Sequence, residues 1–281
     1  MSETEGGIPY FDELFKLIGS DEEWCRAFGK NVHWGYWEDP AKADGSIESF
    51  VEAADALTRK TVSEAPLRDG IRILDVGCGF GGTIQMLNEM VKDSHLIGVN
   101  IEERQLARAR ERVQAKNGNT IEFIHMDANE LHFDEPFDVI FAVECIFHFN
   151  RPRFFRHIKR LLKPEGRFVI TDFVVKRWKM PIFRTLNAIS RNATLATYGD
   201  IDLSYSLTRY RKVAEEAELR CSHDLDISRN TLPTYAFVLR QIKKVADAKR
   251  STRFRKATEG LDKATRWGIL GYHVIAFSHP E

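Results

Sequence analysis

The stretch Ile73-Leu74-Asp75-Val76-Gly77-Cys78-Gly79-Phe80-Gly81-Gly82 decides the fold of this chain. A short, mostly apolar run typical of a buried strand leads into a glycine-rich turn, and a helical pattern begins after the turn. Glycine lets the backbone of such a turn approach a ligand where a side chain would block it. Asp75 precedes the glycines, whereas a dinucleotide-binding fingerprint has its acidic residue at the end of the next strand. The stretch therefore predicts a strand, a ligand-binding turn and a helix.

The pattern around this stretch alternates between short apolar runs and helical periods, which is typical of a parallel sheet covered by helices. Five strands are expected first, over Ile71 to Val76, His95 to Asn100, Ile121 to His125, Phe137 to Val143 and Gly166 to Phe173. Two late strands are expected over Arg220 to Ile227 and Gly271 to Ser278. A helix is expected over Glu102 to Lys116, with Leu106, Ala107, Ala109 and Val113 facing the sheet and Asn117-Gly118 as a left-handed cap.

Four segments are expected in one elaborated domain of 281 residues. Residues 1–70 are predicted to form a helical N-terminal cap, and residues 71–175 the cofactor-binding core. Residues 176–235 are predicted to form a lid over the substrate together with a late strand, since so long a mixed insertion is uncommon for a mere connection. Residues 236–281 are predicted to supply C-terminal helices and the last strand.

Composition excludes several classes of protein. The 41 basic residues balance 41 acidic ones, so no overall field attracts nucleic acid or an anionic membrane. The four cysteines form no C-x-x-C pair, and neither a metal site nor a disulfide framework is expected. No leader and no apolar run of membrane-spanning length is seen. We therefore expect a cytoplasmic protein with a small-molecule partner, and the oligomeric state stays open.

The glycine-rich stretch resembles the first motif of the class I S-adenosylmethionine-dependent methyltransferases, a strand ending in D-x-G-C-G-x-G. The resemblance covers about residues 70–175 and continues, in the right order, through Gly98-Val99-Asn100-Ile101, Met126-Asp127-Ala128, Phe137-Asp138-Val139-Ile140 and Leu162-Lys163-Pro164-Glu165-Gly166-Arg167. It implies an α/β, Rossmann-like fold with a mostly parallel seven-stranded sheet and helices on both faces. It also implies S-adenosylmethionine as cofactor and S-adenosylhomocysteine as product.

The same resemblance assigns cofactor-binding residues. Asp75, Gly77 and Gly79 would lie against the methionine part, with Asp75 pairing with its ammonium group. The family commonly has an acid for the ribose hydroxyls where this chain has Asn100, followed by Ile101, and an amide can still bind hydroxyls. Gln105 would also contact the ribose, and its alternative interpretation is an exposed polar residue without a role. Asp127 and the backbone of Ala128 would contact the adenine.

The segment His33-Trp34-Gly35-Tyr36-Trp37 looks like the H-x-G-Y-W/F cap of natural-product, tocopherol and sterol methyltransferases. That resemblance places His33, Tyr36 and Trp37 over the methyl donor, where an aromatic wall favours a sulfonium and excludes water. The alternative is a buried aromatic plug with a satisfied histidine.

Candidate catalytic residues follow the fourth and fifth expected strands, whose carboxyl ends meet at one edge of a parallel sheet. Glu144 is expected to face the cofactor, and His148 to take a proton from a substrate hydroxyl. Asp172 is expected to orient that imidazole or to contact substrate. Relatives that methylate sugar hydroxyls use a His and an Asp in these two regions. The alternative for His148 is a structural role, packed between Phe147 and Phe149.

Taken together, these features predict O-methylation of a hydroxyl on a specialised metabolite of peptide or polyketide type, with no metal required. Carbon methylation of an isoprenoid, with Glu144 stabilising a carbocation, is the first alternative, and N-methylation of a small amine is the second. A nicotinamide-dependent oxidoreductase is disfavoured by the position of Asp75. A catalytically inactive binding protein is disfavoured by the presence of His33, Glu144, His148 and Asp172.

Overall fold

The computed structural model describes residues 9–183, 185, 201–243 and 248–280. Its centre is a seven-stranded sheet in the order β3-β2-β1-β4-β5-β7-β6. The strands are β1 Arg72–Val76, β2 His95–Asn100, β3 Thr120–His125, β4 Phe137–Val143, β5 Leu162–Val175, β6 Arg220–Asp226 and β7 Leu270–Ser278. Strands β1 to β5 are parallel, and β7 runs antiparallel between β5 and β6. The expected Rossmann-like, mostly parallel sheet is confirmed.

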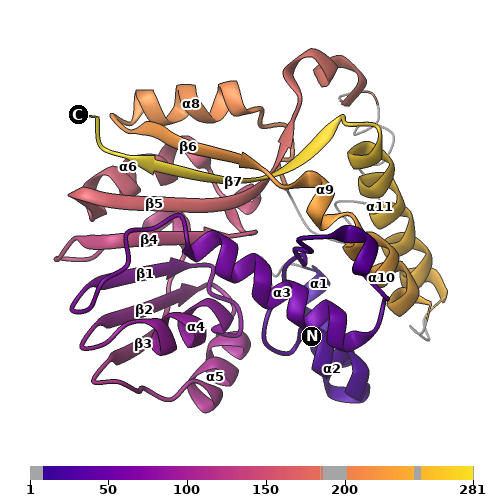
Figure 1. The fold of residues 1–281 in the computed structure, drawn as a ribbon, viewed down its shortest axis with the longest axis horizontal. Coiled ribbons are helices and arrows are strands. Elements are labelled where there is room, and N and C mark those ends of the chain that lie inside the picture. The colour runs from indigo at the N-terminus through magenta and orange to yellow at the C-terminus, as the bar shows by residue number, and fades with distance from the viewer. Residues whose placement is uncertain (1–8, 184, 186–200, 244–247, 281) are drawn as a thin grey trace, which may run out of the picture.

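Helices lie on both faces of the sheet and beyond the carboxyl ends of its parallel strands (Figure 1). Helices α3, α4 and α5 lie along one face, and α6 and α8 lie along the other. Helices α1, α2, α10 and α11 gather beyond the carboxyl edge. The α-helices are α1 Pro9–Ser20, α2 Glu22–Phe28, α3 Ile47–Val62, α4 Gly82–Met90, α5 Glu103–Arg112, α6 Arg151–Leu161, α8 Leu207–Glu216, α9 Ser228–Thr231, α10 Pro233–Ile242 and α11 Ala248–Arg266. Short 3₁₀ turns are η1 Pro40–Lys42, η2 Ala128–Glu130, η3 Ile146–His148 and η4 Arg177–Lys179.

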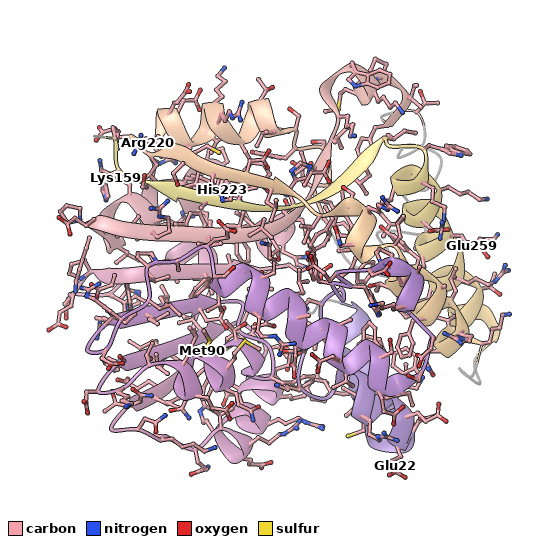
Figure 2. All side chains as sticks on the ribbon, in the orientation of Figure 1. Glu22, Met90, Lys159, Arg220, His223 and Glu259 are labelled. Carbon is pink, nitrogen blue, oxygen red and sulfur yellow. The ribbon has the colours of Figure 1, made fainter. Side chains whose placement is uncertain are left out.

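Each face of the sheet carries an apolar layer, because successive residues of a strand point to opposite faces. A third apolar cluster joins α1, α2, α3 and α10. On β1, Ile73 belongs to the layer beneath α3, α4 and α5, and Leu74 to the layer beneath α6 and α8. Every residue of β4 is buried, as expected for a central parallel strand covered on both sides. Figure 2 shows Lys159 and Arg220 at the end of the sheet where the parallel strands begin, and Glu259 on α11 beyond the opposite end.

Two details of the fifth helix differ from the prediction. Helix α5 ends at Arg112, because Val113 is extended, so Asn117-Gly118 does not cap it. These two residues, with φ of 56° and 74°, instead form a tight turn before β3, in which the Asn119 N–H donates to the Lys116 carbonyl at 2.9 Å. Ala107 is exposed, since the buried face of α5 is formed by Gln105, Leu106 and Ala109.

The predicted lid, residues 176–235, includes parts of the layered core. Helix α8 buries Tyr210, Val213 and Ala214 against the sheet, and β6 is its edge strand. Residues 184 and 186–200 of the predicted lid lie outside the described residues. A covering role therefore stays a prediction for the part before α8. No helix of the described ranges is long and apolar enough to cross a membrane.

Candidate functional site

A cavity of about 430 Å³ lies at the carboxyl ends of β1, β2 and β4. This is the edge at which open parallel sheets bind ligands. Most of the residues expected at the site line this cavity, namely His33, Asp75, Gly77, Gly79, Asn100, Ile101, Gln105, Asp127, Ala128, Glu144 and His148. The structure thus brings the resemblance-based candidates from five separate sequence segments into one place.

The glycine turn forms the floor of the cavity. Gly77 and Gly79 have φ of 70° and 53°, a region that glycine enters without steric cost. A Cβ on Gly77 would lie 2.7 Å from the Cβ of Cys145, whereas a Cβ on Gly79 would meet no atom within 4 Å. Gly77 is therefore required by packing within the protein, and Gly79 faces open space.

Asp75 is a buried carboxylate with an unfilled hydrogen-bonding position. It lies at the end of β1, is 1% exposed, and its Oδ2 has no hydrogen-bond partner among the described residues. Burial raises the pKa of Asp75 to about 8, although a hydrogen bond with the side chain of Thr83 acts in the opposite direction. A buried carboxylate without a cation is costly, so this position is suited to a positively charged ligand group.

Asn100 and Gln105 form a linked pair of amides at the end of β2. The Asn100 Nδ2 donates to Gln105 Oε1 at 2.6 Å, and Asn100 Oδ1 accepts from the Ile101 N–H at 2.9 Å. Gln105 is only 2% exposed, so its interpretation as an exposed polar residue is wrong. Asp127 follows the neighbouring strand β3 and lines the same cavity, and its Oδ1 accepts from the Asn129 N–H at 2.8 Å.

Glu144 follows β4 in a left-handed conformation, with φ of 52°, which is uncommon for a residue with a side chain. The Glu144 N–H donates to the Thr171 hydroxyl at 3.0 Å, and Glu144 Oε2 accepts from the Trp34 N–H at 2.7 Å. Burial raises the pKa of Glu144 well above its usual range, and the neighbouring Asp172 adds to that rise. The carboxyl group therefore favours its neutral form.

His148 ends the η3 turn and lines the same cavity as Glu144. Its backbone N–H donates to the Cys145 carbonyl at 3.0 Å, and the centroid of its ring lies 4.7 Å from that of Phe147. Phe149 packs instead against Phe154, at 4.9 Å. The imidazole is thus held on one side by an aromatic ring while it borders the cavity.

Asp172 does not line the cavity, contrary to the role expected for it. Its carboxylate is fully buried on the α6 side of β5, where Oδ2 accepts from Arg151 Nη2 at 2.9 Å and from the Tyr210 hydroxyl. The reason is the alternation along β5, since Thr171 and Phe173 point to the opposite face. The sequence pattern indicates where β5 ends, but it does not indicate that the Asp172 side chain points to the α6 side of the sheet.

Two aromatic residues of the predicted cap also lie outside the cavity lining. The Tyr36 hydroxyl donates to Glu38 at 2.9 Å near the surface. Trp37 donates from Nε1 to the Ser49 hydroxyl at 3.1 Å and lines a separate hollow beside α10. Between His33 and these two rings, the Gly35 N–H donates to the Thr234 hydroxyl at 3.0 Å.

His33 does reach the cavity, but both of its ring nitrogens are engaged. Nδ1 lies 2.9 Å from the Trp34 carbonyl, and Nε2 lies 3.1 Å from the Thr58 hydroxyl. Burial lowers the pKa of His33, so the neutral ring donates from Nδ1 and accepts at Nε2. This geometry matches the satisfied, buried histidine that was the alternative interpretation.

The residues that sequence reasoning missed come mainly from the N-terminal segment and from the start of α4. Phe11 of α1 lines the cavity together with Lys30, Asn31 and Thr83. Thr83 follows the glycines at the first turn of α4, which is a signal that could have identified it. No sequence periodicity indicates that Phe11 packs over a ligand site. Among the described residues, no group of His, Cys, Asp and Glu is suited to hold a metal ion.

Comparisons with known proteins agree with this geometry. A family model described as a methyltransferase domain matches residues 73–166. The methyltransferase GfsG of Streptomyces halstedii is 30% identical over 233 residues, which cover 82% of this chain and 78% of that protein. The 27-O-demethylrifamycin SV methyltransferase of Amycolatopsis mediterranei is 32% identical over 229 residues, covering 80% of this chain and 77% of that protein.

The fold is shared more widely than the sequence. The cyclopropane synthase MmaA2 from Mycobacterium tuberculosis matches with a TM-score of 0.78 at 16% identity, over 96% of this chain and 98% of that chain. The motif order, the cavity at the sheet edge and the two relatives that match over more than three quarters of both chains lead to one conclusion. The chain belongs to the class I S-adenosylmethionine-dependent methyltransferases and is an enzyme that uses this cofactor.

Proposed function

We propose that this enzyme transfers a methyl group to a hydroxyl of a small specialised metabolite of peptide or polyketide type. The observation that carries the proposal is that His148 and Glu144 border the same cavity as Asp75 and the glycine turn. The name of the rifamycin relative, which covers most of this chain, supports an oxygen acceptor.

The cavity fits the cofactor in its polar groups. We propose that Asp75 binds the ammonium group, because its Oδ2 is buried and has no partner in the described ranges. The open side of Gly79 leaves space for the methionine part. Asn100 and Gln105 would bind the ribose hydroxyls, beside Ile101. Asp127 and the backbone of Ala128 would hold the adenine.

When bound, S-adenosylmethionine supplies an electrophilic methyl group. The residues of the chain then have to orient an acceptor oxygen and remove its proton. We propose that His148 accepts this proton, since a neutral imidazole is a suitable base near neutral pH. Glu144 holds the backbone of Trp34 over the site through its accepted hydrogen bond, and His33 holds that backbone from the other side.

Carbon methylation of an isoprenoid remains the second candidate. A cluster of three aromatic rings favours it, because the Trp34 N–H is bonded to Glu144 and the ring centroids of Trp34 and Phe173 lie 5.8 Å apart, and those of Phe147 and Phe173 6.4 Å apart, although none of the three lines the cavity. Such rings stabilise developing positive charge. Burial raises the pKa of Glu144, so stabilising a cation there would require the carboxyl group to lose its proton first.

The experiment is an acceptor screen with mass spectrometry. The acceptors are 27-O-demethylrifamycin SV, a macrolactone with free hydroxyls, geranyl diphosphate and phosphoethanolamine. We expect a gain of one methyl group on a hydroxyl of the first two. Methylation of geranyl diphosphate alone, abolished in Glu144→Gln and retained in His148→Gln, would establish the second candidate instead. Methylation of phosphoethanolamine alone would move the assignment to an amine acceptor.

A further inference from the structure

A buried charged cluster lies on the face of β5 away from the cavity, and its arginine follows the proposed base by three residues in the sequence. Arg151, the first residue of α6, is 1% exposed. Its Nη2 donates to Asp172 Oδ2 at 2.9 Å, and its Nε donates to the Tyr210 hydroxyl at 2.8 Å. The Tyr210 hydroxyl donates in turn to Asp172. Burial disfavours the charge on Arg151, yet its contacts with Tyr210 and Asp172 raise its pKa above the usual range.

The same guanidinium also holds the segment that precedes α8, residues 201–206. Arg151 Nη2 donates to the Asp202 carbonyl at 2.8 Å, and Nη1 lies 3.6 Å from the Asp202 carboxylate. Two guanidinium groups contact the Tyr205 ring, since the Cζ of Arg151 lies 4.0 Å from the ring centroid and the Cζ of Arg209 lies 3.9 Å from it. One fixed cation therefore contacts both the core and this segment.

This segment connects the end of β5 to the η3 turn. The Val175 N–H donates to the Tyr205 carbonyl at 2.8 Å, and the Asp202 N–H donates to the Phe147 carbonyl at 2.9 Å. Phe147 precedes His148, and the two rings are 4.7 Å apart. Arg151 follows His148 by a few residues on the same connection. It thus holds the His148 turn twice, through the start of α6 and through residues 201–206.

A wholly apolar filling of this space would be expected to give as much stability, because burying an ion pair costs desolvation free energy. What the fork of a guanidinium adds is direction, since its N–H groups point to fixed acceptors in one plane. Asp172 and Tyr210 are fully buried, so the fork is oriented by the core. The Asp202 contacts depend on that orientation.

We propose that Arg151 is a positioning residue for methyl transfer, which sets the place of the η3 turn and of His148 relative to the cavity. The proposal rests on the function proposed above, in which His148 is the base. It gives Asp172 a role through Arg151, in place of direct contact with substrate or imidazole.

The test compares Arg151→Lys, which keeps the charge and loses the fork, with Arg209→Lys as a matched control. Arg209 contacts the same Tyr205 ring and lies 3.7 Å from the Asp202 carboxylate, but it is half-exposed and has no contact with Asp172 among the described interactions. In Arg151→Lys we expect kcat to fall by roughly 10- to 100-fold, as for a misplaced catalytic group, with the KM for the cofactor within about twofold. Arg209→Lys should retain near-native values.

Hydrogen exchange provides a readout that needs neither acceptor nor activity. In Arg151→Lys the Asp202 and His148 amides should exchange roughly 10-fold faster or more, while the Gly77 and Cys78 amides at the cofactor turn stay protected. If Arg151→Lys does not fold, Tyr210→Phe removes one bond of the same fork and is measured in its place. Unchanged exchange at Asp202 and His148 would overturn the positioning role, whatever the acceptor. Faster exchange throughout the chain would overturn it too, because the role would then be general stability. Faster local exchange in an enzyme that methylates no hydroxyl would reject only the proposed function.

Discussion

The two halves of the carboxyl edge of the sheet differ in how their polar groups are satisfied. At β1 the buried Asp75 leaves one oxygen without a partner, and Gly79 faces open space. At β5 the buried Asp172 is bound by Arg151, by Tyr210 and by the Phe173 N–H at 2.7 Å. Both carboxylates were expected at the site from sequence. The comparison supports the proposals that the incomplete carboxyl group of Asp75 binds a ligand and that the complete one of Asp172 supports the site.

The largest expected effect comes from the residue that lies between these halves. His148→Ala should lower single-turnover methyl transfer to a hydroxyl by roughly 10²- to 10⁴-fold, the usual contribution of a positioned base. Affinity for S-adenosylhomocysteine should stay nearly unchanged. His132→Ala, an exposed histidine of the same fold, serves as the control. A near-native rate in a folded His148→Ala enzyme would remove the base from the account.

A pair of glycine variants tests whether Gly77 is required for packing within the protein and Gly79 for space for the cofactor. Gly77→Ala places a methyl group against Cys145 and should destabilise the protein by about 1–3 kcal/mol. Gly79→Ala meets no protein atom, so beyond the strain of its backbone it should act mainly on cofactor affinity. Thermal unfolding and calorimetry separate the two. Equal loss of affinity in both variants at equal stability would contradict the distinction.

The strand bounds that depend on local sequence pattern could be predicted, and those that depend on pairing with distant strands could not. Strand β2 and strand β4 were predicted with their observed bounds, because short, mostly apolar runs between helices leave little freedom. Strand β5 extends beyond its predicted range at both ends, since pairing with β7 continues to Val175↔Leu270 and pairing with β4 reaches Leu162. Such pairing depends on partners distant in sequence, which no local pattern encodes.

The site divides likewise. The cavity residues of β1, β2 and the turn after β4 follow from motif order and from the rule that strand ends meet. Asp172 faces away from the cavity, because one step along an extended chain reverses the direction of a side chain. Tyr36 and Trp37 lie outside the cavity lining, in contact with Glu38 and Ser49, and no local pattern encodes these contacts. The fork of Arg151 could not be foreseen, since its partners lie on β5, on α8 and in residues 201–206.

The smallest expected effect tests the cap. Trp37→Phe should leave S-adenosylhomocysteine affinity within about twofold, because Trp37 lies outside the cavity lining and donates to Ser49. Loss of that hydrogen bond should lower the unfolding free energy by about 1 kcal/mol. Calorimetry with thermal unfolding checks both values. A loss of affinity of 10-fold or so without loss of stability would return Trp37 to the cofactor site.

The central claim is that the ammonium group of the cofactor binds the Asp75 oxygen that has no hydrogen-bond partner among the described residues. In the free protein burial raises the pKa of Asp75 to about 8, and binding a cation beside it lowers that pKa. Binding near neutral pH must then release a proton, so affinity should rise with pH and level off at about pH 8. Asp75→Asn should weaken binding by roughly 10- to 100-fold and abolish the proton release. Because the pKa of Asp75 is raised in the folded state, the native protein loses stability as pH rises toward 8. The asparagine does not titrate, so the folded variant should be at least as stable as the native protein at neutral pH.

The measurement that tests this claim most directly is calorimetric titration of S-adenosylhomocysteine into the native protein and Asp75→Asn, in two buffers of different ionisation enthalpy. The account predicts a buffer-dependent heat for the native protein below about pH 8 and none for the variant. Equal affinity in the two proteins, with heats that do not depend on buffer, would contradict it.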